Sequence, residues 1–348
     1  MKSVYRIALL PGDGIGPDVV AEAVKVLRAL EPQIPSKLEY EELAVGAGEY
    51  LRSGDPLPPP TFDRLSGFDA ILLGAMGLPA VRWPDGTEMT PQIDLREKLD
   101  LFCGLRPIRL YHGSHSPLKD KQKGEIDFLI IRENTEGLFF SRLNKPAPDA
   151  TEVRDIMRIS RERSERLFVS AFEQARNRRK HVTLVDKANV LPSMAFFRRI
   201  FDEVSERYPD VKTERAYVDA ASLYLVQRPH SFDVIVTENM FGDILSDLAA
   251  GLVGGMGMAP SADVGPKHGV FQPSHGTAPD IAGKGIANPV ATILSAAMML
   301  EWLGIHAAAK RIESAVSKVM EDGHRTSDLG GNVSTEQMGD LIVSALNG

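Results

Sequence analysis

Short apolar segments alternate with longer amphipathic segments along most of the chain. Runs of three to five apolar residues favour buried strands, whereas apolar residues that recur every three or four positions favour helices. Such an alternation is typical of an α/β sheet with much parallel character. The pattern predicts strands over residues 6–10, 70–73, 128–131, 182–185 and 234–236, and helices over residues 17–30, 154–178 and 192–207.

Three further segments are interpreted from their composition. The most apolar one, residues 289–300, is too short to span a bilayer and predicts a buried helix. The proline-rich residues 53–61 predict an extended, exposed loop. The apolar run at residues 7–10 is shorter than a signal peptide requires. We therefore expect a cytoplasmic protein with no membrane partner.

Charge and cysteine content narrow the function further. The 348 residues include 40 Lys or Arg and 47 Asp or Glu, so the formal net charge is −7. This charge gives no electrostatic reason to expect a nucleic-acid partner. The single cysteine, Cys103, excludes an intramolecular disulfide and any zinc or iron–sulfur site built from several cysteines.

A glycine-rich turn follows the first predicted strand. Residues 10–17 read LPGDGIGP, a spacing that differs from the dinucleotide-binding pattern G-x-G-x-x-G. The turn either allows close packing of a strand against a helix or contributes to nucleotide binding, and the sequence leaves both interpretations open.

Two aspartates lie four residues apart in a predicted helix. Residues 241–247 read FGDILSD, so Asp243 and Asp247 share one helix face. Like charges at this spacing repel each other, and a divalent cation bound by their oxygens would offset the repulsion. A solvated acidic face is the alternative. The neighbouring apolar residues, including Ile244, predict a largely buried helix and so favour the metal site.

Four basic residues near strand ends are candidates for substrate binding and proton transfer. Arg96, Arg106 and Arg132 are natural bidentate partners for carboxylates, with surface ion pairs as the alternative for each. Lys187 follows a predicted strand, where burial would lower the pKa of its ammonium group and suit it to proton transfer. Simple exposure is the alternative for this lysine.

Together these segments resemble the isocitrate/3-isopropylmalate dehydrogenase family, the metal-dependent oxidative decarboxylases of β-hydroxyacids. The resemblance covers nearly the whole chain. Beyond LPGDGIGP, its motifs are LREKLDLFCGLRP at 95–107, RENTEG at 132–137, VDKANVL at 185–191, FGDILSDL at 241–248 and HGTAPDIAGKGIANP at 275–289.

The resemblance implies a two-domain α/β fold that is distinct from the Rossmann fold, with a mixed sheet flanked by helices. Residues 1–99 plus 256–348 would form the cofactor-side domain. Residues 100–255 would form the central domain, with the metal ligands and a dimer interface. A homodimer with shared active sites is implied as well.

The same resemblance implies catalytic and metal-binding roles. Lys187 and Asp219 would be catalytic, with Lys187 assisting loss of the substrate hydroxyl proton. Asp219 of one subunit would join Asp243 and Asp247 of the other in binding Mg²⁺ or Mn²⁺. The shared site would thus draw its residues from two chains.

The implied substrate is a dicarboxylic hydroxyacid, whose carboxylates would be bound by Arg96, Arg106 and Arg132. In the family, an acidic residue five positions after the histidine of HGT marks NAD enzymes, and lysine followed by tyrosine marks NADP enzymes. Asp280, followed by Ile281, indicates NAD, because a carboxylate repels a 2′-phosphate. The implied cofactor-binding residues are His275, Gly276, Asp280, Ile281, Asn288 and Asn189.

Two positions depart from the family pattern. Phe139 replaces the tyrosine of RENTEGxY, whose phenol protonates the enol carbon after decarboxylation. Residues 87–94 match neither the leucine pair of isopropylmalate enzymes nor the serine and asparagine of isocitrate enzymes. The resemblance implies NAD-dependent oxidation, with decarboxylation, of a 3-substituted malate like 3-isopropylmalate. A tartrate/D-malate or isocitrate-type dehydrogenase and a non-catalytic regulatory subunit are the alternatives.

Overall fold

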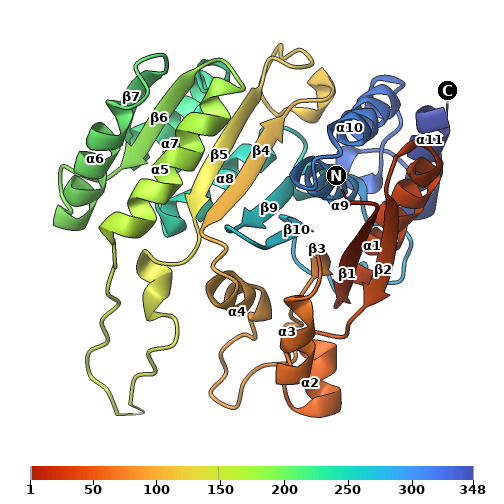
Figure 1. Cartoon of the computed structure of the whole chain (residues 1–348), viewed down its shortest axis with the longest axis horizontal. Coiled ribbons are helices and arrows are strands. Elements are labelled where there is room, and N and C mark those ends of the chain that lie inside the picture. Colours follow the sequence, from red (N-terminus) through yellow and green to blue (C-terminus); the bar gives the residue numbers. More distant parts are fainter. Residues whose placement is uncertain (1, 148, 348) are drawn as a thin grey trace.

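The computed structural model describes residues 2–147 and 149–347, which form a ten-stranded mixed sheet flanked by helices (Figure 1). The predicted α/β class is confirmed, and each predicted strand is present. In chain order the strands are β1 (Val4–Gly12), β2 (Lys37–Glu42), β3 (Ala70–Ala75), β4 (Cys103–Arg109), β5 (Asp127–Glu133), β6 (His181–Asp186), β7 (Lys212–Tyr217), β8 (Val234–Thr237), β9 (Pro260–Val264) and β10 (Gly269–Pro273).

Helices connect most of the strands, and the predicted helices at 17–30, 192–207 and 289–300 are confirmed as α1, α6 and α9. None of the helices within residues 2–147 and 149–347 is long and apolar enough to cross a membrane. The helices are α1 (Gly16–Leu30), α2 (Ala47–Ser53), α3 (Pro59–Leu65), α4 (Pro91–Lys98), α5 (Arg161–Arg176), α6 (Pro192–Ser205), α7 (Val218–Gln227), α8 (Asn239–Gly251), α9 (Val290–Trp302), α10 (His306–Glu321) and α11 (Thr335–Asn347).

The centre of the sheet is antiparallel and its two sides are parallel. The strand order is β2-β1-β3-β10-β9-β4-β5-β8-β6-β7, with antiparallel pairing from β10 through β9 and β4 to β5. The register places Gly104 of β4 opposite Arg132 on one side and opposite Asp263 on the other. Charged residues that are distant in sequence therefore meet at the centre of the sheet.

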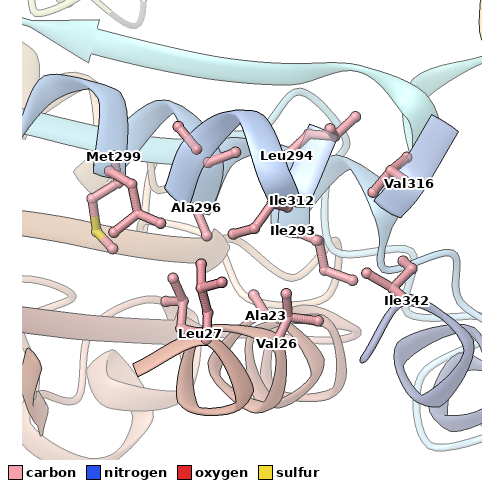
Figure 2. Close-up of a cluster of buried hydrophobic side chains, with 14 of the residues drawn as sticks. Ala23, Val26, Leu27, Ile293, Leu294, Ala296, Met299, Ile312, Val316 and Ile342 are labelled. Atoms are coloured by element: carbon pink, nitrogen blue, oxygen red, sulfur yellow. The ribbon is translucent and has the colours of Figure 1, made fainter. Parts of the chain in front are cut away.

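Separate groups of helices build the hydrophobic core on the two sides of this centre. The two ends of the chain share one cluster, in which α1, α9, α10 and α11 meet around Leu27, Ile293, Ile312 and Ile342 (Figure 2). On the other side, α5 and α6 pack phenylalanines against β6 and β8. The division into residues 1–99 plus 256–348 and residues 100–255 stays a prediction, because the sheet is continuous across it.

The predicted helix over 154–178 is wrong at its start, since α5 begins at Arg161. The backbones of Gly137 and Arg158 form a reciprocal pair, with N···O distances of 2.9 and 3.1 Å. In addition, the amide of Ser160 donates to Glu136 Oε1 at 2.8 Å. These contacts hold the backbone before Arg161 in an extended form that is incompatible with a helix.

The predicted exposed loop over 53–61 is also wrong in part. Leu57 is buried in the core, and helix α3 begins at Pro59. Proline suits the first turn of a helix, where the missing amide hydrogen would have no partner in the helix. The proline-rich segment is therefore a helix start as well as a loop.

The glycine-rich turn at residues 10–17 serves close packing. Gly14 has a φ of +60°, and a Cβ there would lie 2.0 Å from the carbonyl oxygen of Thr277. The Asp13 carboxylate accepts hydrogen bonds from the amides of Ala47, Gly48 and Gly77 at 2.7–2.8 Å. The turn thus fixes the loop that contains Thr277 against the first strand.

Candidate active site

Five charged side chains from four elements line one cavity at the centre of the sheet. Arg96 comes from α4, Arg106 from β4 and Arg132 from β5, while Asp243 and Asp247 come from α8. The structure thus brings the predicted arginines together with the predicted acidic pair. The cavity, of about 170 Å³, is also lined by Gln92, Gln272, His275 and Gly276.

The three arginines are buried, so the alternative of surface ion pairs is wrong. Arg96, Arg106 and Arg132 are 7%, 5% and 2% exposed. The Nε and Nη2 groups of Arg132 donate to Asn239 Oδ1 at 3.0 and 2.7 Å. Burial, assisted by the charge of Arg96, lowers the pKa of Arg132 to about 10. The guanidinium therefore remains charged at neutral pH and can bind an anion.

Asp263 was not among the predicted site residues, yet it holds two of these arginines. Its Oδ2 accepts from Arg96 Nε and Gln272 Nε2, both at 2.8 Å. Its Oδ1 accepts from Arg106 Nη2 at 3.1 Å and Asn134 Nδ2 at 2.8 Å. Burial alone would raise the pKa of Asp263, but the charges of Arg96 and Arg106 outweigh burial and lower it to about 2. An aspartate inside an otherwise uncharged strand was the available sequence signal.

Helix α8 presents the acidic pair to the cavity, as its sequence predicted. The helix begins after Glu238, whose Oε1 accepts from the amide of Phe241 at 2.6 Å. Asp243 forms an ion pair with Arg132. Partial burial and, to a smaller extent, the negative charge of Asp243 raise the pKa of Asp247. The two carboxylates therefore repel each other, and a cation would relieve this repulsion.

This pair fits a divalent cation, because Mg²⁺ and Mn²⁺ prefer oxygen ligands. In the two described ranges of the chain, no group of three or more His, Cys, Asp and Glu side chains is arranged to hold a metal. One chain therefore offers two of the three implied ligands. The prediction of a largely buried helix is wrong for Ile244, which is 58% exposed.

Lys187 and Asp219 lie together, but outside the cavity lining of their own chain. Lys187 follows β6, Asp219 lies in the first turn of α7, and Lys187 Nζ lies 2.8 Å from Asp219 Oδ1. The hydrogen bond from Lys187 lowers the pKa of Asp219. Asn189 is exposed in the same segment after β6. These implied site residues form a separate group within the described part of the chain.

The loop after β10 brings two implied cofactor residues, His275 and Gly276, to the cavity. His275 Nδ1 donates to the Gly276 carbonyl at 2.9 Å, which leaves Nε2 as an acceptor. Nε2 is buried and finds no partner among the described protein atoms. Burial of the ring lowers the pKa of His275 and keeps it neutral. A buried acceptor with no protein partner fits a bound cofactor that donates a hydrogen bond.

The other implied cofactor residues of this loop differ in accessibility. Asp280 is exposed and Ile281 is half-buried. Asn288 is buried, and its side chain accepts from the Val290 amide at 3.1 Å and donates to Asp328 at 3.1 Å. Asp280 is thus accessible to a ligand, whereas the Asn288 side chain is hydrogen-bonded to the start of α9 and to Asp328.

Phe139 lies beside the cavity, directly beneath one of its arginines. The guanidinium carbon of Arg132 lies 5.3 Å from the centre of the Phe139 ring. This is the distance of a cation–π contact. The ring therefore supports Arg132 but has no proton to donate.

Proteins of known sequence are similar to this chain over nearly its whole length. A family model described as isocitrate/isopropylmalate dehydrogenase matches residues 6–342. A 3-isopropylmalate dehydrogenase from Albidiferax ferrireducens is 47% identical over 98% of this chain and 99% of its own length. Another, from Mannheimia succiniciproducens, is 43% identical over 99% of this chain and 100% of its own length.

Solved structures give the same result. An isocitrate dehydrogenase from Methylococcus capsulatus matches with a TM-score of 0.90 and 38% identity, covering 99% of this chain and 100% of that chain. A beta-decarboxylating dehydrogenase from Thermococcus kodakarensis matches with a TM-score of 0.83 and 38% identity, covering 99% and 96%. This chain therefore belongs to the isocitrate/isopropylmalate dehydrogenase family of oxidoreductases.

Proposed function

We propose that this enzyme oxidises a 3-substituted malate, 3-isopropylmalate or a close analogue, with NAD and Mg²⁺ or Mn²⁺, and that decarboxylation follows. The observation that carries the proposal is the convergence of three buried guanidinium groups and two carboxylates on one cavity. Relatives named 3-isopropylmalate dehydrogenase, 43% and 47% identical over nearly the whole chain, support the same substrate class.

The side chains of the cavity divide the work by charge. The three arginines bind and orient the two substrate carboxylates, because guanidinium groups match carboxylates in geometry and charge. Asp243 and Asp247 would hold the divalent cation, which when bound polarises the substrate hydroxyl and stabilises the negative charge left by CO₂. His275 and Gly276 would help to hold the nicotinamide cofactor, which when bound supplies the hydride acceptor. Lys187, paired with Asp219, would assist loss of the hydroxyl proton.

Two copies of the chain are needed for this division of work. Lys187 and Asp219 lie outside the cavity of their own chain, although the reaction requires a proton acceptor. Val190 and Leu223, which lie a few residues from this pair in the sequence, expose apolar side chains, as does Ile244 of α8, a helix in contact with α7. A second copy packed on this surface would cover these side chains and bring its Lys187 and Asp219 to the cavity. This supports a homodimer with shared active sites.

The preference for NAD rests on Asp280. Its carboxylate is exposed on the loop that begins at His275, where it can accept hydrogen bonds from ribose hydroxyls. A 2′-phosphate at the same place would meet a negative charge. The neighbouring Ile281 provides no compensating cation.

The experiment that tests the function is a substrate panel. The purified protein is incubated with NAD, Mn²⁺ and malates that carry different 3-substituents, with D-malate, tartrate and isocitrate in parallel. We expect NADH to form fastest with an alkyl-substituted malate such as 3-isopropylmalate, with release of CO₂. Absence of NADH across the panel would contradict the proposal, and faster turnover of isocitrate or tartrate would correct the substrate.

A further inference from the structure

We propose that Asp263 is the positioning residue for the carboxylate-binding arginines and thereby sets the affinity of this enzyme for its dicarboxylate substrate. This inference rests on the proposed function, because it assigns the arginines to substrate binding. It concerns a side chain that contacts neither the implied metal ligands nor the cofactor loop by any hydrogen bond in the described part of the chain.

The acceptor capacity of Asp263 is fully used by the protein. A carboxylate offers about four acceptor sites, and Asp263 receives four donors at 2.8–3.1 Å. The donors come from α4, β4, β10 and the segment after β5. The carboxylate has no site left for substrate or metal, so its effect on binding must pass through Arg96 and Arg106.

The two arginines need this common partner. Both arginines are buried. Burial lowers the pKa of Arg106, and the charge of the neighbouring Arg96 lowers it further. An arginine carries five N–H donors, and in the described chain each of the two commits one to Asp263. Asp263 therefore fixes the direction of the remaining donors, which are those that a substrate carboxylate can reach.

The substitution Asp263→Asn keeps the shape of the side chain and removes its charge. The amide then turns an NH₂ group towards donors, and Arg96 and Arg106 lose their shared anchor. Hydrogen bonds to charged groups correspond to about a 10- to 100-fold change in an equilibrium constant. We expect the KM for the 3-substituted malate to rise by about this factor, while the KM for NAD changes less than about threefold.

A second substitution provides a rescue. Gln272 Nε2 lies 2.8 Å from Asp263 Oδ2, so a glutamate at position 272 places a carboxylate in the same cluster. We expect Asp263→Asn combined with Gln272→Glu to recover most of the lost affinity. Gln272→Glu alone places a second carboxylate beside that of Asp263, and we expect their repulsion to lower the midpoint temperature of unfolding.

The matched control is Asp233→Asn. Asp233 is likewise 1% exposed, and its Oδ1 accepts a hydrogen bond from Arg178 Nε at 2.9 Å. Unlike the arginines that Asp263 holds, Arg178 does not line the cavity, and neither does Asp233. We expect this control to lower the thermal midpoint without changing the KM for substrate. Calorimetric titration of the enzyme in the absence of NAD, with D-malate as a simple analogue of the substrate, would report anion binding without turnover.

Three outcomes would overturn the proposal: an unchanged substrate KM in Asp263→Asn, an equal loss for substrate and NAD, or no recovery in the double variant. Each of these leaves the proposed function intact if the unmodified enzyme still forms NADH. Failure of the unmodified enzyme across the whole substrate panel would instead refute the proposed function.

Discussion

The arginine cluster and the Lys187–Asp219 pair serve the same proposed reaction but are built in opposite ways. The cluster is complete within one chain, and its carboxylate, Asp263, is 1% exposed. Buried charges are stable only when they are paired and hydrogen-bonded, so folding alone organises this half of the site. The Asp219 side chain is 69% exposed and lies outside the cavity. Folding thus prepares the binding half, whereas in the proposed homodimer proton transfer requires a second copy of the chain.

The largest effect that we expect comes from separating the two halves of the site by mutation. Lys187→Ala removes the group that we propose assists loss of the hydroxyl proton, and Asp243→Asn removes a proposed metal ligand. We expect each change alone to reduce activity by about 10²- to 10⁴-fold. If the active site is shared between chains, a heterodimer of the two variants contains one intact site and one doubly defective site. Mixed subunits would therefore regain about a quarter of the full activity at random exchange.

The control for this experiment is exchange itself, followed by mass spectrometry of differently tagged subunits. Proven heterodimers that remain inactive would show that Lys187 serves its own chain. The contrast between a complete half and an incomplete half of the site would then be wrong.

A smaller effect is expected when the exposed apolar surface is made polar. Leu223→Glu places a charge on α7 where we propose that a second copy packs, and Leu223 is exposed in the single chain. Burying an unpaired charge at an interface weakens it by roughly tenfold or more. We expect light scattering to show monomers and activity to fall in parallel, most strongly at low protein concentration.

Leu51→Glu is the matched control, because Leu51 is also an exposed leucine but lies on α2. This variant is expected to keep both oligomeric state and activity. A fully active Leu223→Glu monomer would contradict the need for assembly.

The half of the site that folding organises was also the half that the sequence predicted only in part. The strands, α8 and the three arginines followed from local patterns, because burial and helical spacing are written in neighbouring residues. The role of Asp263 could not be predicted this way. It depends on the position of β9 between β4 and β10 in the sheet. The paired strands β4 and β9 lie more than 150 positions apart in the sequence.

The start of α5 was missed for a related reason. Residues 154–160 carry a helical pattern, but the backbone of Arg158 pairs with that of Gly137. A tertiary contact of this kind overrides local propensity. In contrast, the exposed Ile244 breaks the expected burial of α8 at the surface where we propose that the second copy packs. These two errors of local patterning therefore fall at a contact between distant segments and at the surface where we propose that a second copy packs.

Asp280, in the loop after β10, sharpens the comparison. Its carboxylate is exposed like that of Asp219, but we expect it to act on the cofactor bound to its own chain. We expect Asp280→Lys combined with Ile281→Tyr to lower kcat/KM for NAD by roughly tenfold and to raise it for NADP, since a cation attracts the 2′-phosphate. Steady-state kinetics with both cofactors measure the change. Equal kcat/KM values for NAD and NADP in the unmodified enzyme would refute the role of Asp280.

The smallest effect on binding is expected at Phe139, which belongs to the complete half of the site through its contact with Arg132. Phe139→Tyr keeps the ring and the cation–π contact, so the substrate KM is expected to change less than about twofold. The added phenol supplies a proton donor at the position where, according to the family resemblance, a tyrosine protonates the enol.

Oxidation does not use that proton, so NADH formation is expected to continue in both forms. The unmodified enzyme is expected to release part of its product without stereospecific protonation. NADH, CO₂ and ketone are followed together in deuterated solvent. Fully coupled and stereospecific protonation in both forms would show that another group already supplies the proton, and that Phe139 only supports Arg132.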